Sequence, residues 1–577
     1  MRRLLLIVML AALAVAVAAQ PGTAAPRVLW PGVTYEPGVQ FTARGPVAIN
    51  VLRGPRPGGL TTLEPVLSND TIVGRETLTA MQRRLATTAT AAGVNGDYFT
   101  FATGRPSGVL LRDGQLVTPP NSGRASAGVT TDGTLDVRRT SFVGSWRGLT
   151  ATRTVRGLNA PPTPDGSALY TDAYGEATPA LPGSVAVVLF PFPAPTPEVD
   201  LVAPVVEERL DGGAVVIPVG GAVLVARGLS ATALTAEAPV GTSMTLRLSL
   251  RPAWPGVLSA IGGGPQIVRS GVALYRSGEV FSNQQLEPRA PRSAVGQLRD
   301  GRIVLVAVDG RQPGYSVGLT NYELAQTLVR LGAVTGMGLD SGGSTTMAFD
   351  GALLNRPSDG RERSIATALM FLYRGVFTPE APALVSPNGD GIAESPNLRY
   401  RVVRPSSVTV TLRPPGGMPP LSSTVTQGPG TYPVSFPATA AAPVPGKWAF
   451  SVNAVDDVGQ ASAMTRSFVV DDTLGFLRVP KLRAVPPAGR EVSITWRLAR
   501  DARASVTVLD EGGKLVRRLL GGARLTTGGQ RLVWDGLGPS RSRLAGRFTV
   551  RVVVASEVGR SELTAPITLV KARAPRR

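Results

Sequence analysis

Short apolar runs separated by Gly-rich turns constrain this chain more than any other feature of its sequence. Residues 28–375 alternate β-branched runs with turns that contain many of the 67 glycines. Beyond residue 396 the sequence is strand-like and shows no helical period. A chain of 577 residues is long enough for three or four domains. The pattern therefore predicts several domains with extensive β-structure, the first of them at 28–375.

An internal repeat divides the C-terminal part of the chain. Gly446–Val452 aligns with Gly546–Val552 at a period of 100 residues. About 100 residues of alternating strands per repeat is typical of a β-sandwich. The second repeat, with Gly512–Arg517 and then Trp534–Gly536, resembles the Ig-like domain of flagellar hook-capping proteins. We therefore predict a linker at 376–390, two all-β Ig-like sandwiches at 391–474 and 475–571, and a basic tail at 572–577.

The positive charge is concentrated in the second of these repeats. The whole chain has a formal net charge of +20, and residues 478–577 contain 21 Lys and Arg against 7 Asp and Glu. A basic module of this kind predicts docking to a polyanion. Because the N-terminus carries an export signal, we expect an anionic cell-wall polymer as the partner and no nucleic acid.

The N-terminal residues have the pattern of a secretory signal peptide. Met1-Arg2-Arg3 precedes an apolar run of 16 residues, Leu4–Ala19, with small residues at its end. A membrane span needs about 20 apolar residues, so this run is short for one. We predict a signal peptide at 1–25, a secreted, cell-surface or periplasmic location, and no membrane association after cleavage. An uncleaved membrane anchor is the alternative.

The sequence contains neither cysteine nor histidine. Disulfides, thiol nucleophiles and thiolate metal sites are therefore excluded, as are the commonest general base and the usual zinc and haem ligands. Any catalysis must use carboxylates, hydroxyls, amides, arginines or a hard cation held by oxygen atoms.

One segment of the first domain predicts a β-α-β unit. Residues 302–308 form a continuous apolar run, which is typical of a strand buried on both faces. Thr320 and Glu323 have the spacing of a capping box before the leucines of residues 324–331, which recur at helical intervals. A second strand is predicted at 334–339. We expect parallel strands joined by a right-handed crossover, and hence a mixed α and β (α+β) domain with a β-α-β core.

A carboxylate ends each strand of this unit. Asp309 follows the first strand and Asp340 follows the second. The carboxyl ends of parallel strands are where open α/β sheets place their ligand sites. In the run 340–346, glycines let backbone N–H groups approach an anion and hydroxyls add further donors. A loop for a phosphate or a sugar is one interpretation, and a turn capped by Asp340 is the other.

Three further segments have the same density of small and polar residues. Asn95–Phe99 follows a stretch at 78–92 that predicts a helix. Gly262–Pro265 predicts a tight loop before a strand. Arg292 stands between a proline and small residues, where a guanidinium is either an anion fork or a solvated surface group.

Two Asp-Gly turns have structural interpretations. Asp350-Gly351 predicts the turn of a hairpin. Asn388, Asp390 and Glu394 offer oxygen ligands to calcium, but their spacing does not complete an EF-hand loop. A plain Asn-Gly-Asp-Gly turn is the interpretation that we favour there.

Taken in order, the motifs of residues 45–375 resemble those of the phosphodiester glycosidase family. Each motif by itself is weak evidence for the family, and the resemblance is specific because seven motifs occur in the same order. They are Asn95–Phe99, Ile261–Pro265, Pro291–Gly296, Val308–Arg311, Gly318–Leu324, Leu339–Ser344 and Glu362–Ser364. The family pattern Asn-Gly-Gly-Tyr-Phe has Asp97 at its second glycine here, and Asp-Gly-Gly-Gly-Ser has Ser341 at its first.

The resemblance implies hydrolysis of a sugar-1-phosphodiester at the glycosidic C1–O bond, which leaves a phosphomonoester. The expected substrate is a phosphodiester-linked glycan of the cell envelope or an exopolysaccharide. This reaction asks for a carboxylate near C1 and for positive charge near the leaving phosphate. The site residues that the resemblance implies are the carboxylates Asp340, Asp309 and Asp97, and around the substrate Asn95, Gly263, Gly264, Arg292, Arg311, Ser344 and Arg363.

Within that set, Asp340 is expected to act as nucleophile, base or electrostatic stabiliser. Asp97 is either catalytic or holds Ca²⁺ or another divalent cation together with Asp340, although no cofactor is required. Arg292 and Arg311 would hold the phosphate. Two alternatives stay open: a non-catalytic or structural protein that binds envelope polysaccharide, and a metal-dependent phosphodiesterase that cuts the P–O bond.

Overall fold

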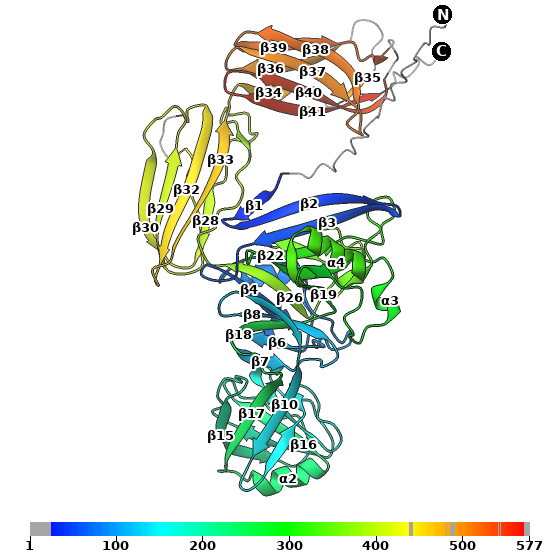
Figure 1. Cartoon of the computed structure of the whole chain (residues 1–577). Helices are drawn as coiled ribbons and strands as arrows, with labels where there is room; N and C mark the ends of the chain where they lie inside the picture. Colours follow the sequence, from blue (N-terminus) through cyan, green and yellow to red (C-terminus); the bar gives the residue numbers. More distant parts are fainter. Residues whose placement is uncertain are drawn as a thin grey trace, which may run out of the picture. The chain divides into compact units, whose positions relative to one another are not determined.

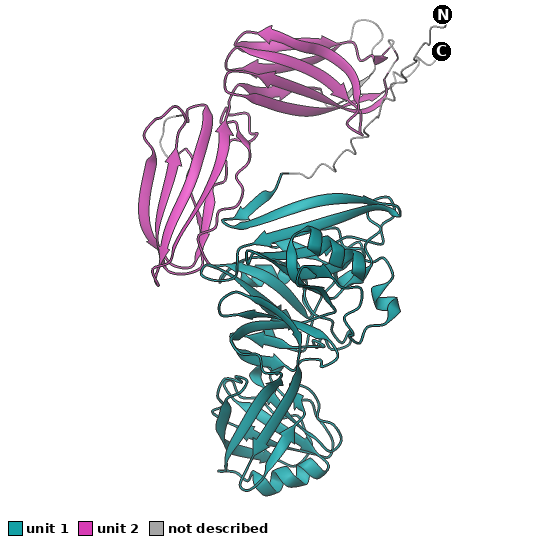
Figure 2. Ribbon diagram, viewed as in Figure 1, with its two compact units in different colours: residues 1–373 teal, residues 374–577 magenta. Residues whose placement is uncertain are grey.

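Strands dominate this protein, and helices are few. The computed structural model describes residues 25–437, 442–480, 482–484, 491–539, 542 and 544–570. Strands make up 50% of the described residues and helices 8%. The expected α+β fold class is therefore wrong, because the protein is mostly β. The chain divides into two compact units, residues 1–373 and 374–577 (Figure 2).

The four α-helices of the described residues all lie in the first unit (Figure 1). They are α1 (Leu78–Leu85), α2 (Leu229–Glu237), α3 (Asn283–Leu286) and α4 (Asn321–Arg330). The predicted capping box of α4 is confirmed: the Thr320 hydroxyl accepts from the Glu323 N–H, and the Glu323 carboxylate accepts from the Thr320 N–H. The predicted signal peptide, apart from residue 25, and the predicted tail at 572–577 lie outside the described residues.

One of the two eight-stranded sheets of the first unit holds the segment that predicted a β-α-β unit. Its order is β1 (Arg27–Trp30), β2 (Val33–Thr42), β3 (Gly45–Gly54), β22 (Ile303–Val308), β21 (Arg292–Leu298), β23 (Ala333–Gly338), β19 (Gln266–Arg269) and β20 (Val272–Ala273). Helix α4 packs against this sheet through Leu324, Ala325 and Leu328 (Figure 1). Burial of this apolar stripe holds the helix in place.

The two strands of that segment do not pair with each other. Strand β21 lies between β22 and β23 and is antiparallel to both. The expected β-α-β core is therefore wrong, because β21 lies between its two strands. Both strands run antiparallel to β21 and hence parallel to each other, and the helix between them is present. The physical reason is that complete burial, which β22 shows at every residue, fits a central antiparallel strand as well as a parallel one.

Two five-stranded sheets complete the surroundings of the site. One has the order β25 (Ala352–Leu353), β24 (Met347–Phe349), β5 (Thr90–Asn95), β26 (Thr367–Tyr373) and β4 (Thr61–Leu67). The other has the order β7 (Gln115–Thr118), β6 (Leu110–Arg112), β18 (Val257–Gly262), β8 (Ala125–Thr130) and β9 (Leu135–Arg139). The predicted hairpin is confirmed, since Asp350 and Gly351 join β24 to β25 with φ of 47° and 79°.

The helix predicted at 78–92 is too long. Helix α1 ends at Leu85, and β5 begins at Thr90 between β24 and β26. Every residue of β5 is buried. Its small side chains let neighbouring backbones approach, as at Gly93, where an added Cβ would lie 2.4 Å from the Leu369 carbonyl oxygen. Tertiary packing thus overrides the helix propensity of the alanines.

Residues 141–251 build a sheet of their own, which the sequence patterns did not separate. Its order is β11 (Thr152–Val155), β10 (Ser141–Arg147), β17 (Ser243–Arg251), β15 (Asp200–Arg209), β14 (Ser184–Leu189), β16 (Ala222–Arg227), β13 (Ser167–Thr171) and β12 (Gly157–Leu158). The core of this lobe includes Trp146, Leu224 and Leu246, and it continues to Leu111 and Ala260 of the neighbouring sheet.

The second unit repeats one sandwich plan twice. The first has β27 (Leu384–Val385), β33 (Ala461–Val470), β32 (Gly446–Asp456), β29 (Ser406–Arg413) and β30 (Leu421–Gln427), with β28 (Arg399–Val402) and β31 (Gly430–Pro433). The second has β35 (Leu482–Ala484), β41 (Arg560–Val570), β40 (Gly546–Ala555), β37 (Ala502–Leu509) and β38 (Leu515–Leu525), with β34 (Leu474–Arg478), β36 (Val492–Leu498) and β39 (Gly528–Trp534). The two five-stranded sheets have matching strand orders, which agree with the repeat in the sequence, and the predicted division into two Ig-like domains stays a prediction. The resemblance of the second repeat to the hook-capping Ig-like domain is likewise a prediction.

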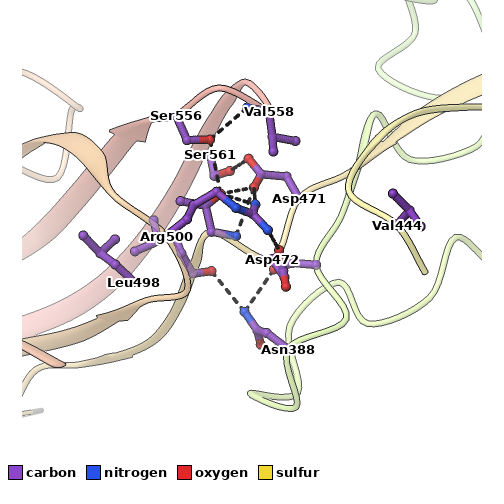
Figure 3. A network of polar contacts seen from close by, with 12 residues as sticks. Asn388, Val444, Asp471, Asp472, Leu498, Arg500, Ser556, Val558 and Ser561 are labelled. Carbon is purple, nitrogen blue, oxygen red and sulfur yellow. Dashed lines mark hydrogen bonds and ion pairs between the residues drawn. The ribbon is translucent and has the colours of Figure 1, made fainter. Parts of the chain in front are cut away.

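A buried carboxylate holds the segment between the two sandwiches (Figure 3). Asp471 is 1% exposed and accepts hydrogen bonds from the Ser561 hydroxyl and, at 3.3 Å, from Nη1 of Arg500. Nη2 of Arg500 also pairs with Asp472 at 2.6 Å. The carboxylate and the guanidinium therefore compensate each other in a place where water is largely excluded.

The Asn-Gly-Asp-Gly run is the turn that we favoured. Oδ1 of Asn388 accepts from the Asp390 N–H at 3.0 Å, and Oδ1 of Asp390 accepts from the Ile392 N–H at 2.9 Å. The second Asp390 oxygen accepts from the Phe476 N–H at 2.9 Å. Backbone donors thus use the oxygens that the calcium interpretation required.

Candidate active site

The candidate site forms where strands of three sheets end or begin beside one another. Strands β5, β23 and β18 end there, and β21 and β8 begin there. Backbone hydrogen bonds join the segments: the Asp340 N–H donates to the Gly96 carbonyl and the Gly264 N–H to the Gly338 carbonyl, both at 2.9 Å. Four of the seven motifs, distant in the sequence, therefore meet at one place.

Asp97 is a buried carboxyl at the centre of this region. Its side chain is 3% exposed, with Oδ2 accepting from the Gly108 N–H at 2.6 Å and Oδ1 from the Tyr98 N–H at 2.8 Å. An added Cβ on Gly262 would lie 2.4 Å from Oδ2, so only glycine fits beside the carboxyl. Burial raises the pKa of Asp97 to about 7, against the effect of these two donors.

Asp340 is the second carboxyl of the site. Burial raises its pKa to about 6, although the Ser344 hydroxyl and the Ser341 N–H, at 2.8 Å from Oδ1, favour the ionised form. The negative charge of Asp340 is one of the factors that raise the pKa of Asp97. The two carboxyls therefore interact, and ionisation of Asp340 makes ionisation of Asp97 less favourable.

Asn95 holds the backbone of Asp340 in place. It is 1% exposed, and its Nδ2 donates to the Asp340 carbonyl at 2.8 Å. Its Oδ1 accepts from the Ser293 hydroxyl at 2.6 Å and from the Thr346 N–H at 3.1 Å. All of these partners are protein groups, so the structure places Asn95 as a support for the site. The resemblance had placed it against the sugar.

The glycines at 263 and 264 permit close backbone approach. An added Cβ on Gly263 would lie 2.8 Å from the Gly338 carbonyl oxygen. Gly264 has φ of 97°, which favours glycine, and an added Cβ would lie 2.6 Å from the Glu279 carboxylate. The loop is therefore packed against the end of β23, beside Asp340.

Arg124 belongs to the site and was missed by the sequence analysis. Its guanidinium lies 4.9 Å from the ring centroid of Tyr98 and 4.8 Å from that of Phe281. Its positive charge lowers the pKa of both Asp97 and Asp340. Within the described part of the chain, its guanidinium has no hydrogen bond and no ion pair. An arginine after Gly123 and before a strand of small residues resembles the setting of Arg292, and that was the available signal.

Arg292 is also near the site, but its side chain is already engaged. It is 4% exposed, and burial lowers its pKa. The guanidinium donates to the backbone carbonyls of Gln285, Leu286, Pro288 and Leu319. These bonds tie β21 to helix α3 and the loop after it. The geometry makes Arg292 a buried anchor for the backbone.

Arg311 and Arg363 lie on either side of the loop after Asp340, the 3₁₀ turn η3 (Gly342–Ser344). An added Cβ on Gly342 would lie 3.2 Å from the guanidinium nitrogens of Arg311. The Arg311 side chain is exposed and, among the described residues, has no hydrogen-bonding or ion-pair partner. Arg363 packs against Gly343, pairs with Asp359 at 2.6 Å and lowers the pKa of Asp340.

Asp309 lies in a separate polar network. It is fully buried, and burial raises its pKa. Its oxygens accept from Asn355 Nδ2 at 2.8 Å, from the Tyr315 hydroxyl at 3.0 Å and from the Arg356 N–H at 3.2 Å. Asn355 in turn accepts from the Met347 N–H at 2.7 Å, just beyond the Asp340 loop. Asp309 thus supports that loop through Asn355.

Two negative findings concern metals and membranes. In the described ranges, no three carboxylates come together in a group that would hold a metal ion. The same residues include no helix with the length and apolar character of a membrane span.

Residues 201–372 match the sequence model of the phosphodiester glycosidase family. This segment contains Asp340, Arg311 and Arg363, whereas Asp97 and Arg124 come before it. The match therefore covers one of the two interacting carboxyls, and Asp97 lies outside it.

Curated relatives and a solved structure are also similar to parts of the chain. The SPbeta prophage-derived uncharacterized protein YomE of Bacillus subtilis is 33% identical over 128 residues, 22% of this chain and 20% of that protein. The N-acetylglucosamine-1-phosphodiester alpha-N-acetylglucosaminidase of Bos taurus is 40% identical over 111 residues, 16% of this chain and 21% of that protein. The chain thus spans about a fifth of their lengths. A hypothetical protein from Synechocystis shares the fold, with a TM-score of 0.52 and 24% identity over 62% of this chain and 65% of that chain.

Proposed function

We propose that this chain hydrolyses the glycosidic C1–O bond of a sugar-1-phosphodiester and leaves a phosphomonoester. The observation that carries the proposal is a pair of interacting carboxyls, the buried Asp97 and the partly buried Asp340, with the guanidinium groups of Arg124 and Arg363 near enough to lower a carboxyl pKa. The family match over residues 201–372 and the similarity to the Bos taurus enzyme support the class of reaction.

Asp340 stabilises the positive charge that develops at C1 as the bond breaks. With a pKa of about 6 it is ionised at neutral pH, and a carboxylate near C1 is the usual partner of an oxocarbenium-like transition state. The Ser344 hydroxyl and the support from Asn95 hold this carboxylate in one position.

Asp97 accepts the proton of the attacking water. A phosphomonoester anion is a good leaving group and needs no strong acid, so the remaining proton transfer is from water. A carboxylate with a pKa of about 7 suits that task near neutral pH. The water oxygen bonds to C1, the C1–O electron pair leaves with the phosphate, and Asp97 takes the proton. Activity should then rise as both carboxyls ionise and level off above about pH 8.

Arg124 and Arg311 bind the phosphate in this proposal. Both lack ion-pair partners in the described part of the chain, and a guanidinium matches the geometry of phosphate oxygens. Arg292 positions the backbone through the carbonyls that it already binds, and Asp309 supports the Asp340 loop.

Product analysis in ¹⁸O-labelled water tests the proposal. The full mature chain, incubated with a sugar-1-phosphodiester, should release free reducing sugar that carries the label at C1, with an unlabelled phosphomonoester. Asp97→Asn and Asp340→Asn should each lower kcat at least about 100-fold, while Asp300→Asn, an exposed carboxylate, serves as the matched control. Normal turnover in both site variants would remove the assignment.

The two rival functions give different outcomes in the same assay. A metal-dependent phosphodiesterase would put the label on phosphate, produce a sugar phosphate and stop when a chelator is added. A non-catalytic polysaccharide-binding protein would give no product with the wild-type chain.

The location of the substrate is part of the proposal. We place it in the cell envelope or an exopolysaccharide, because of the predicted signal peptide and the basic C-terminal module. The module would hold the enzyme on an anionic polymer. Co-sedimentation of the full chain with isolated cell walls, and its release by salt, tests this attachment.

A further inference from the structure

A groove of about 510 Å³ lies next to the candidate site, and apart from Arg363 its lining residues have no role in the reaction described above. Its lining residues are Arg75, Phe101, Asp359, Arg361, Glu362, Arg363 and Ser364. Arg363 connects the groove with the site, because it packs against Gly343 on one side and lowers the pKa of Asp340. A substrate bound at Asp340 could therefore continue into this groove.

The groove offers unpaired positive charge. Its two carboxylates are engaged: Asp359 pairs with Arg363 at 2.6 Å, and Glu362 accepts from the N–H and the hydroxyl of Thr79 at 2.8 and 2.7 Å. Arg75 and Arg361 are both exposed. Among the residues that the structure describes, neither guanidinium has a hydrogen bond or an ion pair. The groove thus has two arginine side chains available for an anionic ligand.

An exposed aromatic ring completes the groove. Phe101 is 62% exposed, and the Arg75 guanidinium lies 4.2 Å from its ring centroid. Two backbone contacts hold this pair of loops together: the Gly74 N–H donates to the Thr103 carbonyl at 2.8 Å, and Gly104 packs against Gly74, where an added Cβ would lie 1.9 Å from the carbonyl oxygen. The Phe101 ring and the Arg75 guanidinium therefore lie side by side on two loops that contact each other.

We infer that this groove binds the unit that follows the scissile bond, a sugar that carries a second phosphate. Arginine forks suit phosphate oxygens, and an exposed aromatic ring suits the apolar face of a sugar. The volume of the groove lies within the usual range for small-molecule sites. This inference rests on the proposed function and narrows its substrate class to glycans with repeated phosphodiester links.

Two substrates of the full chain test the inference. One is a sugar-1-phosphodiester of a neutral alcohol, and the other has the same scissile bond but a leaving sugar phosphate that carries a second phosphate. The second should have a kcat/KM at least about tenfold higher, mainly through a lower KM, and the advantage should shrink as salt screens the charges.

Paired variants separate the groove from the catalytic groups. The double variant Arg75→Ala, Arg361→Ala should lose the preference and keep its activity on the neutral substrate. The matched control is Arg209→Ala, Arg302→Ala, which removes two exposed arginines of the same unit that pair with acidic neighbours and should keep the preference.

The outcomes distinguish the two claims. Equal kcat/KM for both substrates, with hydrolysis intact, would overturn the groove assignment and leave the proposed function standing. An equal loss on both substrates in the groove double variant would also overturn it. If the wild-type chain hydrolyses neither substrate, the proposed function fails and the inference fails with it.

Discussion

Replacing Asp97 by Asn should change how the stability of the first unit depends on pH. Burial raises the pKa of this carboxyl from 3.8 to about 7. A carboxyl whose folded-state pKa is raised contributes stability below its unfolded pKa, and this contribution is lost as the pH rises through the folded-state pKa. The shift of about 3 pKa units corresponds to about 4 kcal/mol of unfolding free energy lost between about pH 4 and pH 7.

Asparagine has no charge at any of these pH values and avoids that loss. Its amide has one oxygen, however, and Asp97 accepts from both the Gly108 and the Tyr98 N–H groups. One buried N–H therefore loses its acceptor, at a cost of about 1–3 kcal/mol. We expect Asp97→Asn to be less stable than the wild-type chain at pH 4 by about that amount, and more stable than it at pH 8 by about 1–3 kcal/mol.

Calorimetry of the full chain between pH 4 and pH 8 measures this difference. The unfolding transition of the second unit can be identified with the variant Arg500→Ala, which is expected to lower the midpoint temperature of that transition alone. Asp300→Asn, whose side chain is 53% exposed, is the control for the loss of a carboxylate at the surface. If the difference in unfolding free energy between Asp97→Asn and the wild-type chain stays constant over this pH range, the reasoning that burial holds the carboxyl protonated is refuted.

Three other substitutions test separate parts of the structure. Gly343→Ala would place a Cβ 1.9 Å from Arg363 Nη2, so kcat/KM should fall about tenfold or more. Because Arg363 would move away from Asp340, the acidic inflection of the pH–rate profile should move to a higher pH. An inflection at an unchanged pH would contradict this. Arg500→Ala leaves the Asp471 carboxylate buried without its cation, so calorimetry should show that the unfolding free energy falls by about 2–4 kcal/mol. Replacing the exposed Arg302 by Ala should lower it by less than about 1 kcal/mol. Asp309→Asn should cost about 1–3 kcal/mol with no change in the shape of the pH–rate profile, and the disappearance of an inflection would instead make Asp309 catalytic.

Local patterns in the sequence predicted the elements well where one interaction decides them. The capping box of Thr320 and Glu323, the Asp350-Gly351 hairpin and the Asn388 turn all depend on partners within a few residues. The repeat at a period of 100 was found from the similarity of two sequence segments, and the two five-stranded sheets of the second unit have the same strand order. Patterns of this kind do not depend on which strands become neighbours.

The pairing of strands was not readable in this way. The continuous apolar run at 302–308 predicted the first strand of a β-α-β core, but β21 lies between this strand and β23. The alanines and the glycine of β5 were predicted to continue a helix, but in the structure they form a buried strand between β24 and β26. Pairing depends on contacts across tens to hundreds of residues, which local propensity does not encode.

The absence of cysteine and histidine determined by itself that any catalysis must use carboxylates, hydroxyls, amides, arginines or a cation held by oxygen atoms. The family resemblance then implied a site that contains Asp97 and Asp340. Only the tertiary structure decided what each group is free to do. It engaged Arg292 with backbone carbonyls and Asp309 with Asn355 and Tyr315, and it brought Arg124 to the two carboxyls. The reason is physical: whether a buried charge is available for a ligand, and what its pKa is, depends on the neighbours that folding places around it.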